Sequence, residues 1–205
     1  MQVGSGNVHQ VPVRALQAQS FPVFAVDPVD QGDHTVRQCT LDGKVLMTIG
    51  VPGKPAEFQS GHPFNRCTDV ALDPKTGEIY VSDGYGNARV HKYSPDGKLL
   101  FSWGSPGTDP GEFNIVHNIA TDREGYVYVA DRENHRVQVF DSNGRLQAIW
   151  SNIWKPSGIR VGSDGNVYIA ELIGDEYFAD APDVGHRVSI YSRSGKLLGR
   201  LGDSQ

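Results

Sequence analysis

Residues 117–147 read HNIATDREGYVYVADRENHRVQVFDSNGRLQ, and this stretch decides the fold. It contains two pairs of short apolar runs, one joined by a turn at Gly125 and the other by Asn143-Gly144. Glycine in such a turn accepts a positive φ, and Asn-Gly or Asp-Gly between β-rich runs is a strong hairpin signal. The stretch therefore predicts four short antiparallel strands joined by tight turns.

The second half of this unit recurs four times along the chain. Each copy has a valine followed seven residues later by a turn glycine, and the copies lie at 34–46, 88–100, 135–147 and 186–198. The first half recurs three times, at 68–83, 117–131 and 157–171. Four strands that repeat about every 50 residues have the size and strand count of a β-propeller blade.

Two other architectures fit the pattern less well. An ordinary β-sandwich explains evenly spaced strands but not the fourfold recurrence of one pattern. A helical solenoid is excluded because no segment keeps a 3.6-residue apolar period. Glycine and proline make up about 18% of the 205 residues, against roughly 12% in average proteins, which fits a chain of many turns. We therefore predict an all-β fold, a β-propeller of four-stranded blades.

The first unit is incomplete in its pattern. Residues 11–30 contain no turn glycine and no Val-Tyr-Val strand, so we assign residues 1–31 to a degenerate or misread N-terminal segment and residues 32–205 to the blades. The pattern then amounts to three good blades and parts of a fourth, whereas propellers close with about 4–8 blades. Because open blade edges promote pairing between chains, we expect a partial or truncated propeller that can self-associate.

Composition limits the partners and the compartment. The formal net charge of −5 argues against nucleic acid, whose phosphates need clustered Lys and Arg. No apolar run approaches the ~18 residues that cross a bilayer, and the N-terminus lacks a signal-peptide pattern, so we expect no membrane partner and a cytoplasmic location by default. Cys39 and Cys67 are too few for a disulfide framework.

Four motifs in the middle of the chain carry a resemblance to a known family. They read FNRCTDVA at 64–71, VSDGYGNAR at 81–89, GEFNIVH at 111–117 and VADREN at 129–134. In this order and spacing they resemble peptidyl-α-hydroxyglycine α-amidating lyase, and they resemble its bacterial NHL-repeat relatives more closely still. The similarity extends over roughly residues 32–202.

The resemblance implies a six-bladed propeller, of which about four blades would be present here. It also implies a zinc ion near the axis, held by three histidines, and a tyrosine that acts on the substrate hydroxyl. The reaction would split a peptidyl-α-hydroxyglycine into a peptide amide and glyoxylate. By motif, Tyr85 matches the catalytic tyrosine and His117 matches one zinc ligand. A peptide or a small hydroxylated substrate would bind in the propeller channel.

The repeat alignment gives His117 a place that suits this role. His117 opens the first strand of its unit, and the same position holds Thr68 and Ser157 in the neighbouring units. Histidines at this position in alternate blades would form a trigonal set around a zinc ion. One imidazole does not hold a catalytic zinc, so we expect an incomplete zinc site and a chain that is inactive or incomplete as a lyase.

Other recurring residues indicate blade architecture rather than chemistry. Histidines recur two residues before the anchor valine, where we expect hydrogen bonds to neighbouring loops; they are His34, His135 and His186. Acidic residues recur at the end of the Val-Tyr-Val strand, where we expect turn caps; they are Asp83, Asp131 and Glu171.

Two classes of function stay open on the sequence alone. The first is an enzyme, a zinc lyase of the amidating type or a relative with another hydroxylated substrate. The second is a non-catalytic NHL-repeat propeller whose loops bind a peptide or a protein. A propeller fold hosts both classes, so the fold does not decide whether the chain is an enzyme.

Overall fold

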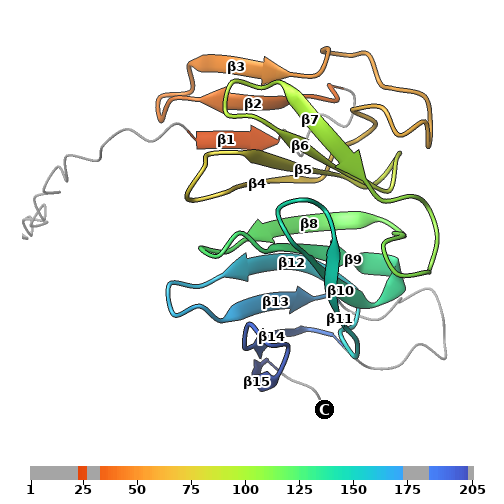
Figure 1. Cartoon of the computed structure of the whole chain (residues 1–205), viewed down its shortest axis with the longest axis vertical. Coiled ribbons are helices and arrows are strands. Elements are labelled where there is room, and N and C mark those ends of the chain that lie inside the picture. Colours follow the sequence, from red (N-terminus) through yellow and green to blue (C-terminus); the bar gives the residue numbers. More distant parts are fainter. Residues whose placement is uncertain (1–22, 27–32, 173–184, 203–205) are drawn as a thin grey trace, which may run out of the picture.

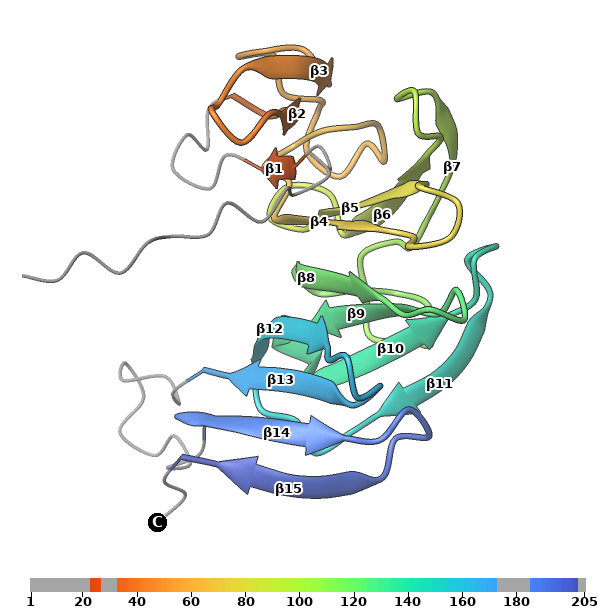
Figure 2. The ribbon, with the colours of Figure 1, turned by 90° about the vertical axis from the view of Figure 1, so that its left-hand side faces the viewer.

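The computed structural model describes residues 23–26, 33–172 and 185–202. Its strands pair in chain order into four antiparallel sheets, which Figures 1 and 2 show following one another from the orange end to the blue end. The first sheet has three strands and the other three have four strands each. The structure therefore confirms an all-β chain of propeller blades.

The blades have the following strands. The first contains β1 (Val23–Val26), β2 (Val36–Cys39) and β3 (Val45–Ile49). The second contains β4 (Asp69–Leu72), β5 (Ile79–Asp83), β6 (Arg89–Tyr93) and β7 (Leu99–Trp103). The third contains β8 (Val116–Thr121), β9 (Val127–Asp131), β10 (Arg136–Phe140) and β11 (Leu146–Trp150), with a 3-10 turn η1 (Arg132–Asn134) after β9. The fourth contains β12 (Pro156–Val161), β13 (Val167–Glu171), β14 (Arg187–Tyr191) and β15 (Leu197–Leu201).

The first strands of the second, third and fourth blades lie side by side. Strand β8 packs against both β4 and β12. Polar side chains join them: the Thr68 hydroxyl donates to the Val116 carbonyl at 2.7 Å, and the Ile159 amide donates to Asn118 Oδ1 at 2.9 Å. Residues at the start of β4, β8 and β12 are therefore held next to one another.

Strand β1 is a feature that the sequence pattern missed. Val26 pairs with Val36, as Ser82 pairs with Val90 in the second blade, so β1 corresponds to β5 and is the second strand of its blade. Its sequence, Val-Phe-Ala-Val, lacks the central tyrosine of the repeat. Most of segment 1–31 lies outside the described residues, and the boundary at residue 31 stays a prediction.

The core lies between adjacent blades. Three apolar clusters fill the three junctions, and large side chains such as Phe64, Phe113 and Tyr128 are almost fully buried in them. All five residues of β5 and of β9 are buried. Both faces of a blade are covered by its neighbours, which explains why these strands do not alternate between apolar and polar residues.

The recurring histidines and acids build the blade junctions. The Arg66 amide donates to His34 Nδ1 at 3.0 Å, and the Lys155 amide donates to His135 Nδ1 at 3.2 Å, so the predicted bonds to neighbouring loops are confirmed for these two histidines. The acids differ from the prediction, because they clamp the segment that enters the first strand of the blade. Their donors are the backbone amides of Asn65, Asn114 and Trp154 for Asp83, Asp131 and Glu171 respectively.

The backbone of the described residues contains β-strands, turns and the single 3-10 turn. None of the helices found in these residues is long and apolar enough to cross a membrane.

Candidate functional site

The structure brings the two predicted site residues together. Tyr85 lies in the loop between β5 and β6, and His117 is the second residue of β8 on the next blade. Their rings meet edge to face, with centroids 5.9 Å apart and an interplanar angle of 79°. Residues 32 positions apart in the chain therefore form one site at the junction between the second and third blades.

Two glycines explain why Tyr85 reaches His117. A Cβ at Gly84 would lie 1.8 Å from the Val116 carbonyl oxygen, so the loop packs directly on the backbone that precedes His117. A Cβ at Gly86 would lie 2.2 Å from the Asn65 side chain, and the Gly86 amide donates to the Asn65 carbonyl at 2.9 Å. Glycine permits this close approach because it has no side chain to displace the facing backbone.

His117 is held in one tautomer. Its Nδ1 lies 2.7 Å from the Ser157 carbonyl oxygen, which only accepts, so Nδ1 carries the hydrogen and Nε2 carries the lone pair. Burial lowers the pKa of His117 below its usual value; the Ser157 bond opposes this shift, and the positive charge of Arg132 adds to it. The neutral imidazole with a free Nε2 lone pair is the form that a metal ligand or a proton acceptor requires.

Arg132 is a third member of the site, to which the sequence analysis gave no role. It is the first residue of η1, its Nη1 lies 3.3 Å from the Tyr85 hydroxyl, and its guanidinium carbon lies 5.5 Å from the centre of the Tyr85 ring. Its Nε donates to Glu133 at 2.8 Å. The signal was present in the motif VADREN, but the motif alone does not show that this arginine turns toward Tyr85.

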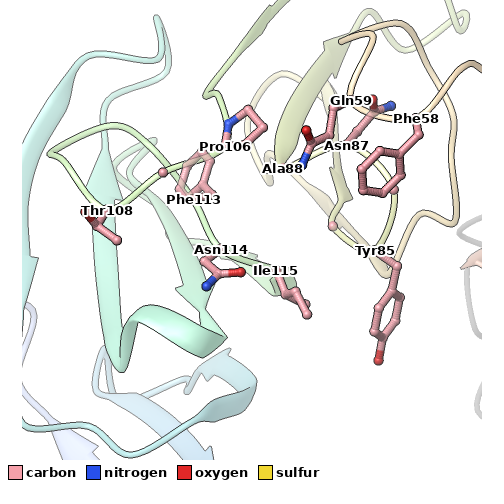
Figure 3. Close-up of a pocket in the computed structure, with 13 residues that line it drawn as sticks. Phe58, Gln59, Tyr85, Asn87, Ala88, Pro106, Thr108, Phe113, Asn114 and Ile115 are labelled. Atoms are coloured by element: carbon pink, nitrogen blue, oxygen red, sulfur yellow. The ribbon is translucent and has the colours of Figure 1, made fainter.

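A cavity of about 330 Å³ adjoins the site (Figure 3). Figure 3 shows its residues on two facing sides, Phe58, Gln59 and the loop with Tyr85 on one and the segment from Pro106 to Ile115 on the other, with the Tyr85 ring pointing away from the cavity at one end. We call it the Tyr85 pocket; its lining residues are Phe58, Gln59, Gly84, Tyr85, Gly86, Asn87, Ala88, Pro106, Gly107, Thr108, Phe113, Asn114 and Ile115. None of these residues carries a charged side chain.

Comparison with known families agrees with the repeat pattern. The family model of the NHL repeat matches residues 64–93 and 113–140, which cover β4–β6 and β8–β10. The chain contains NHL repeats.

The NHL-repeat chain is similar to two kinds of curated protein. It is 37% identical over 142 residues to NHL repeat-containing protein 3 of Homo sapiens, covering 66% of this chain and 41% of that protein. It is 32% identical over 180 residues to a probable peptidyl-α-hydroxyglycine α-amidating lyase of Caenorhabditis elegans, covering 86% of this chain and 45% of that protein. The NHL-repeat chain thus spans less than half the length of these relatives.

Solved structures confirm the propeller. A streptogramin B lyase superposes with a TM-score of 0.57 at 15% identity, over 83% of this chain and 48% of that one. The WD40 β-propeller domain of Doa1 superposes with a TM-score of 0.57 at 11% identity, over 84% of this chain and 48% of that one. At these identities the likeness concerns the fold alone.

The described residues do not by themselves fit a catalytic zinc ion. Within residues 23–26, 33–172 and 185–202 no group of three or more His, Cys, Asp and Glu side chains is placed to hold a metal. His117 fits as one ligand because its Nε2 lone pair is available, but Thr68 at the matching position donates its hydroxyl to Val116. A catalytic zinc takes three protein ligands, and His117 alone would not complete such a set.

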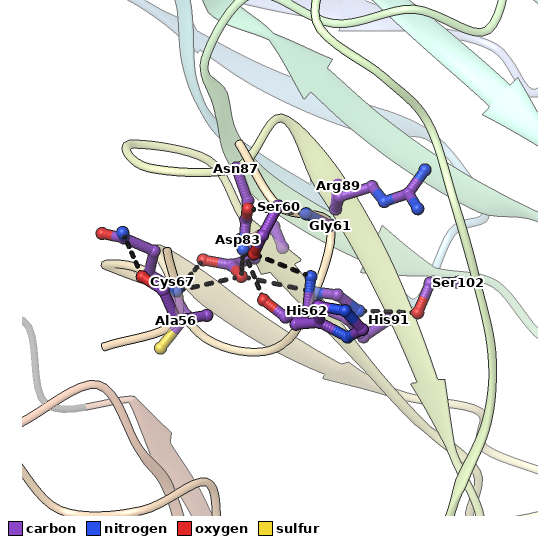
Figure 4. Close-up of polar contacts among 12 residues, drawn as sticks. Ala56, Ser60, Gly61, His62, Cys67, Asp83, Asn87, Arg89, His91 and Ser102 are labelled. Carbon is purple, nitrogen blue, oxygen red and sulfur yellow. Dashed lines mark hydrogen bonds and ion pairs between the residues drawn. The ribbon is translucent and has the colours of Figure 1, made fainter. Parts of the chain in front are cut away.

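A buried His–Asp pair in the second blade is structural (Figure 4). His91 Nε2 lies 3.2 Å from Asp83 Oδ2 and its Nδ1 lies 2.7 Å from Ser102 Oγ, with the side chains of His91 and Asp83 fully buried. Asp83 also accepts from the Asn87 amide at 2.6 Å, and Asn87 donates to the His62 carbonyl at 2.7 Å. The network anchors the loop that carries Tyr85, and its burial excludes contact with a substrate.

Proposed function

We propose that the NHL-repeat chain carries part of an amidating-lyase-type site, in which Tyr85, His117 and Arg132 bind an α-hydroxyglycine at the end of a peptide. The observation that carries the proposal is the meeting of Tyr85 with His117, two residues that the lyase motifs single out independently. The similarity to amidating lyases, at 32% identity over 180 residues for the C. elegans protein, supports it.

The proposed chemistry assigns one role to each side chain. Arg132 lies beside the Tyr85 hydroxyl and pairs with the substrate carboxylate, because a guanidinium binds a carboxylate with charge-assisted hydrogen bonds. The Tyr85 oxygen takes the proton of the substrate hydroxyl as the hydroxyl carbon becomes the aldehyde carbon of glyoxylate. The bond from this carbon to the amide nitrogen breaks, and the phenolic proton that Tyr85 gives up passes to that nitrogen, which completes the peptide amide.

We further propose His117 as one ligand of a zinc site that is completed from outside the described residues. The support is the availability of the Nε2 lone pair and the neutral state that burial favours. Because the other ligands are not among the described residues, we expect the chain alone to bind substrate without efficient turnover.

The test is a titration of the purified protein with N-benzoyl-α-hydroxyglycine. NMR measures binding, and the glyoxylate released measures turnover. We expect amide shifts at Tyr85, His117 and Arg132, and about tenfold weaker binding for Arg132→Ala, which loses a charge-assisted contact. Arg123→Ala removes an exposed arginine from the turn between β8 and β9 and serves as the matched control. Equal affinity of the Arg132→Ala and Arg123→Ala variants would overturn the proposal.

The second candidate is a peptide-binding propeller without chemistry. The similarity to NHL repeat-containing protein 3 and the single candidate zinc ligand among the described residues favour it. Glyoxylate release separates the two: turnover that zinc stimulates and His117→Ala abolishes supports the lyase, whereas peptide binding insensitive to Tyr85→Phe and His117→Ala supports the binding module.

A further inference from the structure

The Tyr85 pocket occupies a place that histidine fills at two other blade junctions. Ala88 lies two residues before its anchor valine, at the repeat position of His34 and His135. All three have left-handed backbones, with φ of 60°, 54° and 52° respectively, so the local path of the chain is the same. The alanine side chain leaves open the space that an imidazole ring takes elsewhere.

The backbone N–H that would donate to an imidazole at position 88 is also present. At the other junctions the imidazole accepts from the backbone amides of Arg66 and Lys155, which lie two residues before Thr68 and Ser157. The equivalent residue here is Ile115, two residues before His117, and it too has a positive φ of 59°. Among the described residues no acceptor takes the Ile115 amide N–H, so a residue that lines the pocket has a backbone donor without a partner.

The walls of the pocket are uncharged and include the apolar side chains of Phe58, Phe113 and Ile115. Phe113 is 1% exposed and forms a wall, whereas Phe58 is 64% exposed although it is a large apolar side chain beside a cavity. The Gln59 amide donates to the Gly86 carbonyl at 2.7 Å, which fixes the Phe58 segment to the Tyr85 loop. The Asn87 amide is already committed to Asp83 and His62 and is not free for a ligand.

We infer that the Tyr85 pocket binds the apolar side chain of the peptide residue that precedes the reacting hydroxyglycine. This inference rests on the proposed function, since Tyr85 lines the pocket and also meets His117 and Arg132. The absence of charge in the pocket beside a guanidinium matches a neutral side chain followed by a carboxylate. The Ile115 amide N–H donates to the carbonyl oxygen of the same peptide residue, so the preferred substrates are peptides with a large apolar residue at this position.

The size of the pocket suits this ligand. Pockets that take small molecules begin at about 300 Å³, and the Tyr85 pocket, at about 330 Å³, has room for one large side chain and its backbone. Burying such a side chain is favourable by about 1.5–3 kcal/mol, which corresponds to at least about tenfold in affinity.

The test compares two probes, N-acetyl-phenylalanyl-glycine and N-acetyl-aspartyl-glycine, by NMR titration of the whole chain. We expect the Phe probe to bind about tenfold more tightly than the Asp probe and to shift the amide of Ile115. Ala88→His restores the repeat residue in a backbone that already suits it, so the variant folds, fills the pocket and removes most of the preference for Phe.

Two further variants keep the test decisive. Phe58→Ala removes the rim and weakens the Phe probe several-fold without a risk to the core, and Leu41→Ala, which truncates another exposed apolar side chain (74% exposed), leaves both affinities unchanged. Arg132→Ala weakens both probes equally, because both end in a carboxylate.

Each outcome has one meaning. Equal affinity for the two probes, with Arg132→Ala still harmful, overturns the pocket assignment and leaves the proposed function standing. A second outcome is a preference for the Phe probe that Ala88→His removes, together with unchanged affinities in Arg132→Ala. This outcome overturns the proposed function, and with it the assignment of the Tyr85 pocket as a subsite of the lyase-type site. Unchanged affinity of the Phe probe in both Ala88→His and Phe58→Ala overturns the inference regardless of the other results.

Discussion

The junction between the third and fourth blades and the junction between the second and third blades are built from the same repeat positions but end differently. In the former, His135 accepts from the Lys155 amide and stacks on Trp154, with ring centroids 4.2 Å apart. At the junction between the second and third blades, Ala88 does not fill this space, so the Tyr85 pocket stays open. The loop that contains Gly84 brings Tyr85 into contact with His117. The difference teaches that one side chain in a fixed backbone decides whether a blade junction is closed or open.

We expect the largest effect on the junction between the second and third blades from Gly84→Ala. The added Cβ meets the Val116 carbonyl oxygen at 1.8 Å, so the Tyr85 loop has to move away from β8. We expect the free energy of unfolding to fall by about 3 kcal/mol, as for severe overpacking, and Tyr85 to lose its contact with His117. Urea denaturation measures the first effect, and the NMR shifts of the His117 ring measure the second.

Gly199→Ala is the control for this substitution. Gly199 lies in β15 with open space around its Cβ position and without a positive φ. We expect its free energy of unfolding to change by less than about 0.5 kcal/mol. A Gly84→Ala variant as stable as Gly199→Ala would contradict the close packing of the Tyr85 loop on β8.

An intermediate effect is expected for His135→Ala, which opens the closed junction. The variant leaves the Lys155 amide without the Nδ1 acceptor and removes the stack on Trp154. A hydrogen bond contributes about 0.5–1.5 kcal/mol, and with the lost stack we expect a fall of about 2 kcal/mol in the free energy of unfolding. His62→Ala, at a histidine outside the repeat position, is the control in the same urea experiment. Equal stability of the two variants would show that the junction histidines do not close the junctions.

The smallest effect concerns the pH dependence of stability through His117. Burial keeps the pKa of His117 in the folded state below the value of 6.5 that applies in the unfolded chain. The unfolded state therefore takes up a proton first as the pH falls below about 6.5, so this group lowers the stability until the folded His117 is protonated in turn. In His117→Gln, which keeps a polar side chain, this part of the pH dependence disappears.

The measurement is the urea midpoint of both proteins at pH values between about 7.5 and 5. Both proteins contain the same other histidines, so the difference between the two curves isolates His117. A wild-type curve parallel to that of His117→Gln would show that His117 is not buried as described.

How far the site could be predicted differs from residue to residue. Tyr85 and His117 were identifiable because their motifs resemble those of a family. Arg132 was not, because its guanidinium reaches Tyr85 only when η1 brings it toward the preceding blade. The alignment of the repeat shows that Ala88 stands where other units have histidine. This replacement indicates a pocket only when the backbone of the surrounding loops is known to be the same as at the other junctions.

Sequence alone determined the local part of this protein: the hairpins, the spacing of the blades and the repeat. Each depends on short-range chemistry, as in the glycine turns whose positive φ recurs at Gly43, Gly97, Gly144 and Gly195. Tertiary structure decided which residues of different blades meet. Tyr85 meets His117 because Gly84 lets two backbones touch, and that contact depends on packing between blades rather than on local preference.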